Sequence, residues 1–222
     1  METSNVLTVG NGKRQRPDHD EYFMRIAMAV RLRANCIGLK VGAVIALDDR
    51  LISAGYNGTP SHMPNCDEGG CYRCGHRDDP AFKSGTGYDV CICVHAEQNA
   101  LMSAARFGIP VQGATLFTTS RPCFGCTKEM LQAQIHAVYF VHDWKHPNAD
   151  LQQEYERLQN AFGGRGGIRQ LKIDDPDQEW AVPARAAVPD DTGHEMPDGA
   201  GEMPDLSARL PVTPRTEDTP DA

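Results

Sequence analysis

Two short segments of the sequence carry side chains that could bind and use a metal ion. The first is a His-x-Glu triplet, His95 to Glu97, and the second is a Pro-Cys-x-x-Cys segment that contains Cys123 and Cys126. Each segment stands at the start of a predicted helix, where the dipole and the free N–H groups favour thiolate over thiol. Cysteines three apart share one helix face, so one metal can take both thiolates, with His95 as a third ligand. Three protein ligands leave one tetrahedral position open, which is the arrangement of a catalytic zinc.

Glu97 lies two residues beyond His95, which places it near the metal but on another side of the helix. This position suits proton transfer between substrate and a water whose pKa zinc lowers towards about 7. Simpler interpretations exist for each segment, because His-x-Glu is common and Cys-x-x-Cys can be half of a zinc ribbon. A ribbon needs its second cysteine pair about 15–20 residues away, whereas Cys71 and Cys74 precede Cys123 by about 50 residues. The combination therefore favours a catalytic zinc over a structural one.

The pairing of His-x-Glu with Pro-Cys-x-x-Cys resembles the signature of zinc-dependent nucleobase deaminases. A Gly-Tyr-Asn-Gly segment at 55–58, together with the long cysteine-bearing loop before His95, makes the sequence similar to deoxycytidylate (dCMP) deaminases from about Tyr22 to about Leu171. The resemblance implies hydrolysis of dCMP to dUMP and ammonia with a catalytic Zn²⁺. It also implies a cytidine-deaminase-like α/β/α sandwich with a five-stranded mixed sheet, a homo-oligomer, and regulation by dCTP and dTTP.

The same resemblance assigns residues to the substrate. It places Asn57 against the sugar and phosphate side of the nucleotide, although Asn-Gly is also a common turn dipeptide. Trp144 occupies a position where family members carry an aromatic side chain near the nucleotide, and a packed surface aromatic is an equal alternative. The sequence does not identify the phosphate ligand. Arg121 and Ser120 are candidates, each with an equally good interpretation as a surface group.

Six further cysteines suggest a second, structural zinc. Some phage dCMP deaminases hold one with cysteines that match Cys36 and Cys66 and with residues shortly before the catalytic histidine. A loop rich in cysteine and poor in apolar residues gains order readily from a metal. The alternative is a set of buried, inert thiols. The candidate ligands are Cys36, Cys66, Cys71 and Cys91. The choice of four stays open, because Cys93 also stands just ahead of His95 and because Cys71, Cys74 and His76 compete.

Apolar periodicity and turn residues predict the elements that position these side chains. Strands alternating with helices predict a three-layer α/β sandwich. An irregular segment as long as 57–94 needs a functional reason or an organising metal. The predicted helices are 18–35, 95–107, 123–134 and 149–162, and the predicted strands are 41–47, 51–56, 114–119, 137–141 and 168–173.

Composition divides the 222 residues into parts. Residues 174–222 hold 13 acidic and 3 basic residues and 8 of the 15 prolines, although the whole chain has a net charge of only −8. We expect a flexible N-terminal segment at 1–17, a deaminase domain at 18–173 and an acidic, proline-rich, disordered tail at 174–222. No stretch is long and apolar enough for a membrane span, and eight cysteines without an export signal favour reduced thiols in the cytoplasm. The nearly neutral domain lacks the basic track that nucleic-acid binding requires.

Two alternatives stay open at this point. One is a deaminase of another cytosine nucleoside or nucleotide, or of a modified cytosine. The other is a non-catalytic, zinc-stabilised regulatory protein on the same scaffold. The intact His-x-Glu triplet argues against the second alternative, because a scaffold has no need of Glu97.

Overall fold

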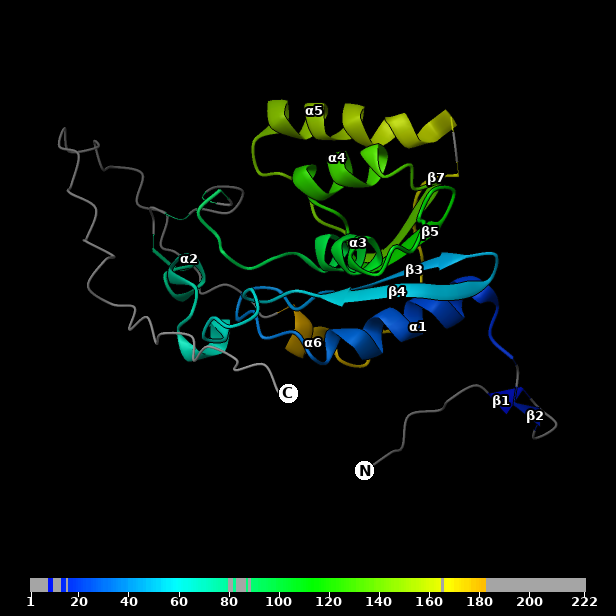
Figure 1. Cartoon of the computed structure of the whole chain (residues 1–222), viewed down its shortest axis with the longest axis horizontal. Coiled ribbons are helices and arrows are strands. Elements are labelled where there is room, and N and C mark those ends of the chain that lie inside the picture. Colours follow the sequence, from blue (N-terminus) through cyan, green and yellow to red (C-terminus); the bar gives the residue numbers. More distant parts are fainter. Residues whose placement is uncertain are drawn as a thin grey trace, which may run out of the picture. The chain divides into compact units, whose positions relative to one another are not determined.

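The computed structural model describes residues 8–9, 13–14, 16–79, 82, 87, 89–164 and 166–182 (Figure 1). All of them belong to one compact unit. Within these residues, no helix combines the length and the apolar character needed to cross a membrane.

A five-stranded sheet forms the centre of the fold, with the strand order β4-β3-β5-β6-β7. β3 runs antiparallel to both β4 and β5, whereas β5, β6 and β7 are parallel to one another. The predicted mixed sheet is therefore confirmed. Its strands are β3 (Gly42–Leu47), β4 (Arg50–Tyr56), β5 (Thr115–Ser120), β6 (Ala137–His142) and β7 (Gly167–Gln170).

β3 and β4 form the predicted hairpin. Asp48 and Asp49 make the turn with φ values of 49° and 58°. Aspartate tolerates this left-handed conformation better than most residues, because its short side chain can bond to the nearby backbone. After the turn β4 runs antiparallel to β3. It ends at Tyr56, immediately before the cysteine-rich loop at 57–94.

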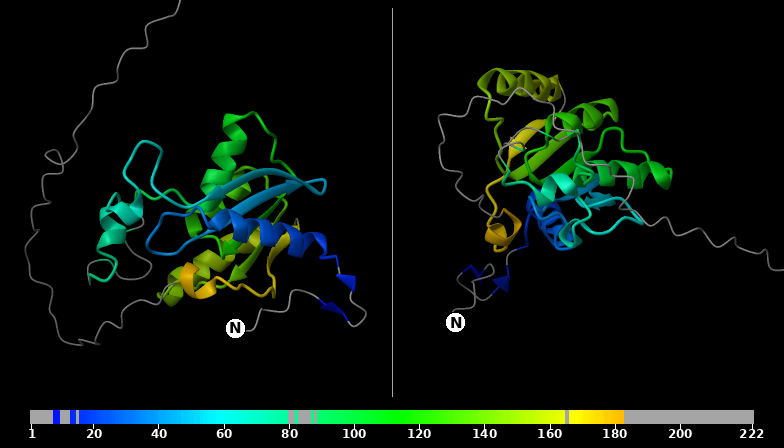
Figure 2. Two further views of the ribbon diagram at one scale, coloured as in Figure 1. Left: turned by 90° about the horizontal axis from the view of Figure 1, so that it is seen from below. Right: turned by 90° about the vertical axis from the view of Figure 1, so that its left-hand side faces the viewer.

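Helices cover both faces of the sheet, as Figure 1 and the left view of Figure 2 show. On one face α1 (His19–Arg31) packs Phe23 and Ala27 against Val44 and Phe117. On the other face α3 (Ala96–Arg106) and α4 (Phe124–Gln132) pack against the alternate residues of the same strands. Successive side chains of a strand point to opposite faces, so the fully apolar β3 contributes to both cores. The predicted three-layer sandwich is confirmed, with α5 (Ala149–Gln159) packed beside α4 and followed by the short helix η3 (Asn160–Gly164).

Residues 57–94 contain little regular structure, as predicted. The described part has only η1 (Cys66–Glu68) and α2 (Tyr72–Gly75). Two backbone hydrogen bonds between Gly58 and Val94, of 2.8 and 3.2 Å, join the two ends of this loop. The loop therefore returns to the sheet immediately before His95.

The chain remains packed beyond the last strand. The predicted tail begins at 174, whereas the structure places Asp175 in the interior and forms the short helix α6 (Gln178–Ala181). A buried ion pair to Arg31 explains why this acidic residue does not lie in solvent. Residues 183–222 of the predicted tail lie outside the described residues. In the predicted N-terminal segment, β1 (Thr8–Val9) and β2 (Lys13–Arg14) form an antiparallel pair.

Candidate metal and active site

His95, Cys123 and Cys126 converge at the start of two helices. His95 is the residue before α3, and its backbone N–H donates to Gln98 Oε1 at 3.0 Å. Cys123 stands before α4, where its Sγ accepts from the N–H of Cys126 at 3.5 Å. The imidazole Nδ1 of His95 lies 3.3 Å from Cys123 Sγ and 3.4 Å from Cys126 Sγ. The three predicted ligand atoms are thus brought together.

These three side chains suit zinc by donor type and by spacing. Zn–S bonds of about 2.3 Å and Zn–N bonds of about 2.0 Å in a tetrahedron place sulfur and nitrogen about 3.5 Å apart, close to the observed distances. The hydrogen bond from Cys126 and the contact with His95 lower the pKa of Cys123, whereas Cys123 and burial raise the pKa of Cys126. A thiolate is the form of cysteine that binds a metal. The donor set therefore fits a zinc ion with one position left for water or substrate.

Glu97 is the acidic side chain beside these ligands. It is 4% exposed, and its Oε1 accepts from Thr118 at 3.3 Å while Oε2 lies 3.7 Å from Cys126 Sγ. Burial raises the pKa of Glu97, although the nearby His95 opposes this effect. A carboxyl with a raised pKa can both accept and donate a proton near neutral pH.

The close approach of α3 to β4 fixes where His95 and Glu97 lie. A Cβ at Gly55 would stand 2.3 Å from the Ala96 carbonyl oxygen and 2.4 Å from the Ala100 backbone nitrogen. On the same strand, the Ser53 hydroxyl donates to the Ala100 carbonyl at 2.6 Å. The first residue of the Gly-Tyr-Asn-Gly segment thus has a packing role that sequence reasoning did not assign.

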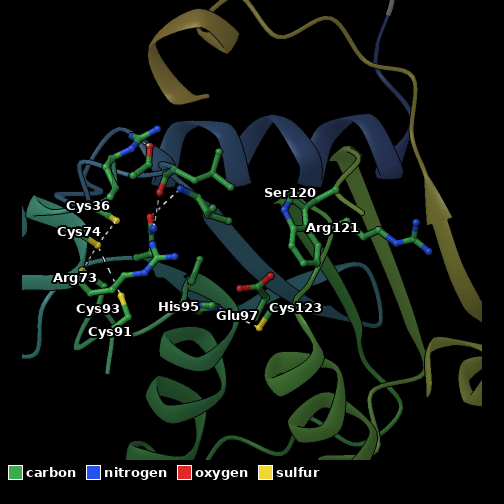
Figure 3. Close-up of a pocket in the computed structure, with 17 residues that line it drawn as sticks. Cys36, Arg73, Cys74, Cys91, Cys93, His95, Glu97, Ser120, Arg121 and Cys123 are labelled. Carbon is green, nitrogen blue, oxygen red and sulfur yellow. Dashed lines mark hydrogen bonds between the residues drawn. The ribbon is translucent and has the colours of Figure 1, made fainter. Parts of the chain in front are cut away.

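A cavity of about 300 Å³ is lined by two of the three candidate ligands, His95 and Cys123, and by Glu97 (Figure 3). Asn57 and Trp144 line it, as the resemblance implied. Asn57 is buried, accepts from the Val41 N–H at 2.8 Å and donates to the Leu39 carbonyl at 2.6 Å. Its side chain therefore holds the cavity wall at residues 39–41, and one amide hydrogen is left for another acceptor.

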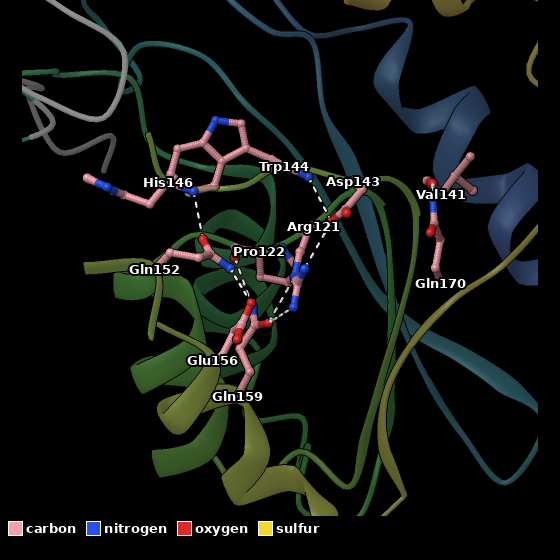
Figure 4. Close-up of polar contacts among 10 residues, drawn as sticks. All are labelled: Arg121, Pro122, Val141, Asp143, Trp144, His146, Gln152, Glu156, Gln159 and Gln170. Atoms are coloured by element: carbon pink, nitrogen blue, oxygen red, sulfur yellow. Dashed lines mark hydrogen bonds and ion pairs between the residues drawn. The ribbon is translucent and has the colours of Figure 1, made fainter. Parts of the chain in front are cut away.

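The two candidate phosphate ligands named from the sequence lie at another side of the same cavity. Ser120 ends β5, and the Arg121 guanidinium that follows is held by Gln159 at 2.6 and 2.9 Å and by Asp143 at 3.0 Å (Figure 4). Trp144 contacts the Tyr155 ring edge-on at 5.8 Å. Arg121 thus joins the end of β5 to α5. These hydrogen bonds use most of the donors of its guanidinium.

Arg73 was missed by sequence reasoning. It lies in α2, is 7% exposed, and lines the cavity opposite Arg121. Figure 3 shows its guanidinium extending from the cysteine loop into the cavity. An arginine in an irregular loop has no periodic signal, and only its place between Cys71 and Cys74 links it to the site.

The six remaining cysteines also lie together. The predicted ligands of a second zinc are divided between two groups whose sulfur atoms lie within 4.8 Å of one another: Cys36 and Cys66 belong to one, and Cys71 and Cys91 to the other. Both groups are completed by the same two cysteines, Cys74 and Cys93. Cysteine spacing alone does not specify this grouping. His76 is exposed and belongs to neither group.

Comparisons with known proteins support this description. The deoxycytidylate deaminase of Saccharomyces cerevisiae is 39% identical over 130 residues, which is 59% of this chain. The chain spans only 39% of the length of that protein. The deoxycytidylate deaminase of Mycobacterium phage D29 is 38% identical over 129 residues, covering 56% of this chain and 95% of the phage protein.

A solved structure shares the fold. The dCMP deaminase of cyanophage S-TIM5, crystallised with dCMP and dUMP, superposes with a TM-score of 0.52 at 25% identity, over 71% of this chain and 99% of the phage chain. The family described as "Cytidine and deoxycytidylate deaminase zinc-binding region" matches residues 17–142 of this chain. That match includes every residue of the His-x-Glu and Pro-Cys-x-x-Cys segments. The chain therefore belongs to the zinc-binding cytidine and deoxycytidylate deaminase family.

Proposed function

We propose that this protein hydrolyses the 4-amino group of dCMP, giving dUMP and ammonia. The observation that carries the proposal is a three-ligand candidate zinc site whose His95 and Cys123 line the same cavity as the buried Glu97. His95, Cys123 and Cys126 hold the metal. Zinc, when bound there, acts as a Lewis acid that makes water a nucleophile near neutral pH.

Glu97 moves the protons that the reaction requires. Attack of water on C4 of the cytosine ring needs a base for the water proton and an acid for the ring nitrogen and the departing amine. Glu97 can serve in both roles in turn, because burial holds its pKa above the ordinary value for a carboxyl. The Thr118 hydroxyl holds its Oε1, and Oε2 lies beside Cys126 Sγ.

The phosphate-binding role belongs to Arg73 in this proposal. A guanidinium matches a phosphate by paired N–H donors, and in a buried wall its charge is weakly screened. Arg121, which lines the same cavity, contacts Asp143 and Gln159. Asn57, through its remaining amide hydrogen, binds the sugar and phosphate side in this proposal, and Trp144 provides an apolar wall.

Several features implied by the resemblance stay predictions: the homo-oligomer, and regulation by dCTP and dTTP. Cytoplasmic action is part of the proposal and is supported by eight free cysteines in the structure. A deaminase of another cytosine nucleoside or nucleotide would use the same metal site and Glu97. A nucleoside deaminase would differ in needing no phosphate ligand.

Ammonia release by the purified protein on dCMP, deoxycytidine, CMP and cytidine tests this proposal. Each substrate is assayed with and without a chelator, and with added dCTP or dTTP. We expect clear preference for dCMP and loss of activity with the chelator. Activity on nucleosides alone would contradict the phosphate assignment, and zinc-loaded protein without turnover on all four would contradict the proposed reaction.

A further inference from the structure

The six cysteines outside the candidate active site form a buried cluster of their own. One follows α1, one begins η1, two lie at the start of α2 and within it, and two stand four and two residues before His95. All are free, and five of the six are buried. Few apolar side chains accompany them, with Ile37 the only one that packs beside the cysteines in the described residues. The cluster members are Cys36, Cys66, Cys71, Cys74, Cys91 and Cys93.

The sulfur atoms are spaced as ligands of a tetrahedral metal. The Cys36–Cys74, Cys71–Cys91 and Cys74–Cys91 Sγ distances are 3.8, 3.8 and 3.7 Å. A tetrahedral ZnS₄ unit with Zn–S bonds of about 2.3 Å has sulfur–sulfur edges of about 3.8 Å. Disulfide bonds, at about 2.05 Å, are far shorter than these contacts.

The six sulfur atoms form two groups of four, and each group matches the four corners of a tetrahedron. One group holds Cys36 and Cys66, and the other holds Cys71 and Cys91. Each is completed by Cys74 and Cys93, whose Sγ atoms are 3.9 Å apart. Two tetrahedra that share two corners share an edge, and a thiolate at a shared corner contacts both centres. A single four-coordinate metal would leave two of the six thiols without a role.

We propose that this cluster binds two Zn²⁺ ions, with Cys74 and Cys93 as bridging thiolates and the other four cysteines as terminal ligands. Zinc suits sites built entirely from cysteine, whereas hard cations such as Mg²⁺ prefer oxygen. Six thiolates and two Zn²⁺ ions carry a net charge of −2. Arg73 and Arg77, which line the adjoining cavity, supply compensating positive charge from the same segment.

The proposed pair of ions explains how an irregular loop forms one wall of the active site. Arg77 donates to the carbonyls of Ile37 and Gly38 at 2.9 and 3.2 Å, next to Cys36. Arg73 lies between two cysteines of the cluster. Metal bonds would therefore hold Arg73 in place in a segment that has little apolar packing of its own.

The first test is the metal content of the purified full chain, with the thiols counted in denaturant. We expect eight reduced thiols and three zinc ions per chain, two in the cluster and one at His95. The Cys123→Ala variant, which removes a ligand from the other site, should keep two. One zinc in that variant, with all seven thiols reduced, would overturn the proposal.

Single substitutions distinguish the two-ion cluster from a single-ion site. Cys71→Ser and Cys66→Ser should each lower the zinc content by one, because each removes a terminal ligand from a different ion. A single ion held by either group would leave one of these two variants with unchanged content. His76→Ala is the matched control, since this exposed side chain lies in the same loop but outside the cluster, and it should keep all three ions.

A measurement on unsubstituted protein tests the bridging directly and does not depend on whether a variant folds. Protein loaded with ¹¹³Cd should give two resonances typical of tetrathiolate sites, coupled to each other because the ions share sulfur ligands. A single such resonance, or two without mutual coupling, would contradict shared thiolates.

Discussion

Arg31 and Asp175 form a doubly hydrogen-bonded ion pair in the interior, although 144 positions separate them in the sequence. The guanidinium Nη1 and Nη2 atoms donate to the two carboxylate oxygens at 2.6 and 2.7 Å. His142 Nε2 lies 2.6 Å from Oδ2 of the same carboxylate. The pair joins α1 and β6 to the segment that follows β7.

Replacing Asp175 by asparagine should destabilise the protein by about 3 kcal/mol, because it leaves the buried Arg31 charge uncompensated. Burial alone would raise the pKa of Asp175, but hydrogen bonds from Arg31 and His142 outweigh it and hold the pKa at about 2. This value is below the ordinary value in the unfolded chain, near 3.9. The stabilisation is therefore present above about pH 4 and disappears as the pH falls from about 4 to about 2.

Urea unfolding of wild type and Asp175→Asn between pH 7 and pH 3 would measure this effect. The difference between the two proteins should narrow as the pH falls from about 4 to 3, because Asp175 of the unfolded wild type takes up a proton there while the native carboxyl, with a pKa of about 2, stays ionised. Glu154→Gln is the control, since the Glu154–Arg157 pair is exposed and should contribute little at any pH. A difference that stays constant down to pH 3 would show that the ion pair is not its source.

Replacing Glu97 by alanine or glutamine should leave fold and zinc content intact and lower kcat by about 10²- to 10⁴-fold, the usual contribution of acid–base catalysis. Zinc analysis and circular dichroism of the same preparation would show that metal and fold are retained. Thr118→Val, which removes only the hydroxyl that donates to Glu97, should have a much smaller effect. Retention of more than a few percent of activity by Glu97→Ala would rule out its role in proton transfer.

Replacing Arg73 by methionine should lower kcat/KM for dCMP by about 10- to 100-fold, the equivalent of about 1.5–3 kcal/mol for a charge-assisted hydrogen bond. The values for deoxycytidine, which has no phosphate, should change little. Arg106→Met is a matched control, since this arginine lies at the end of α3 and does not line the cavity. Equal losses on both substrates, with zinc retained, would point to a distorted cavity and not to phosphate binding.

Replacing Gly55 by alanine should displace the start of α3, because the added methyl would meet backbone atoms 2.3–2.4 Å away. We expect destabilisation of about 1–3 kcal/mol, as for other overpacked sites, and loss of activity through the shift of His95 and Glu97. Thermal unfolding and the dCMP assay would measure the two effects. Gly113→Ala is a contrasting case, because no atom crowds that position and its positive φ is the only source of strain. It should retain activity.

The sheet, the covering helices and the convergence of the candidate ligands His95, Cys123 and Cys126 could be predicted because each has a local signal. Alternating or continuous apolar residues mark the strands, and metal-binding side chains at helix starts mark the site. Asp175 could not be predicted, since acidic and proline-rich neighbours indicate solvent exposure and its partner is remote in the sequence. The same holds for Arg73 and for the division of the six cysteines. Their grouping depends on how an irregular loop folds back, which no periodic pattern encodes.

The segment after β7 determines how short a working fragment of this protein can be. The backbone N–H of Lys40 donates to the Ala181 carbonyl at 2.9 Å, and the Trp180 ring lies 5.0 Å from the Lys40 ammonium. Residues 38–41, which wall the cavity, therefore rest on α6. A fragment cut after residue 173 would keep every strand of the large sheet and every candidate catalytic ligand, yet lose this support and the partner of Arg31. Expression of the catalytic region alone should extend at least to residue 182.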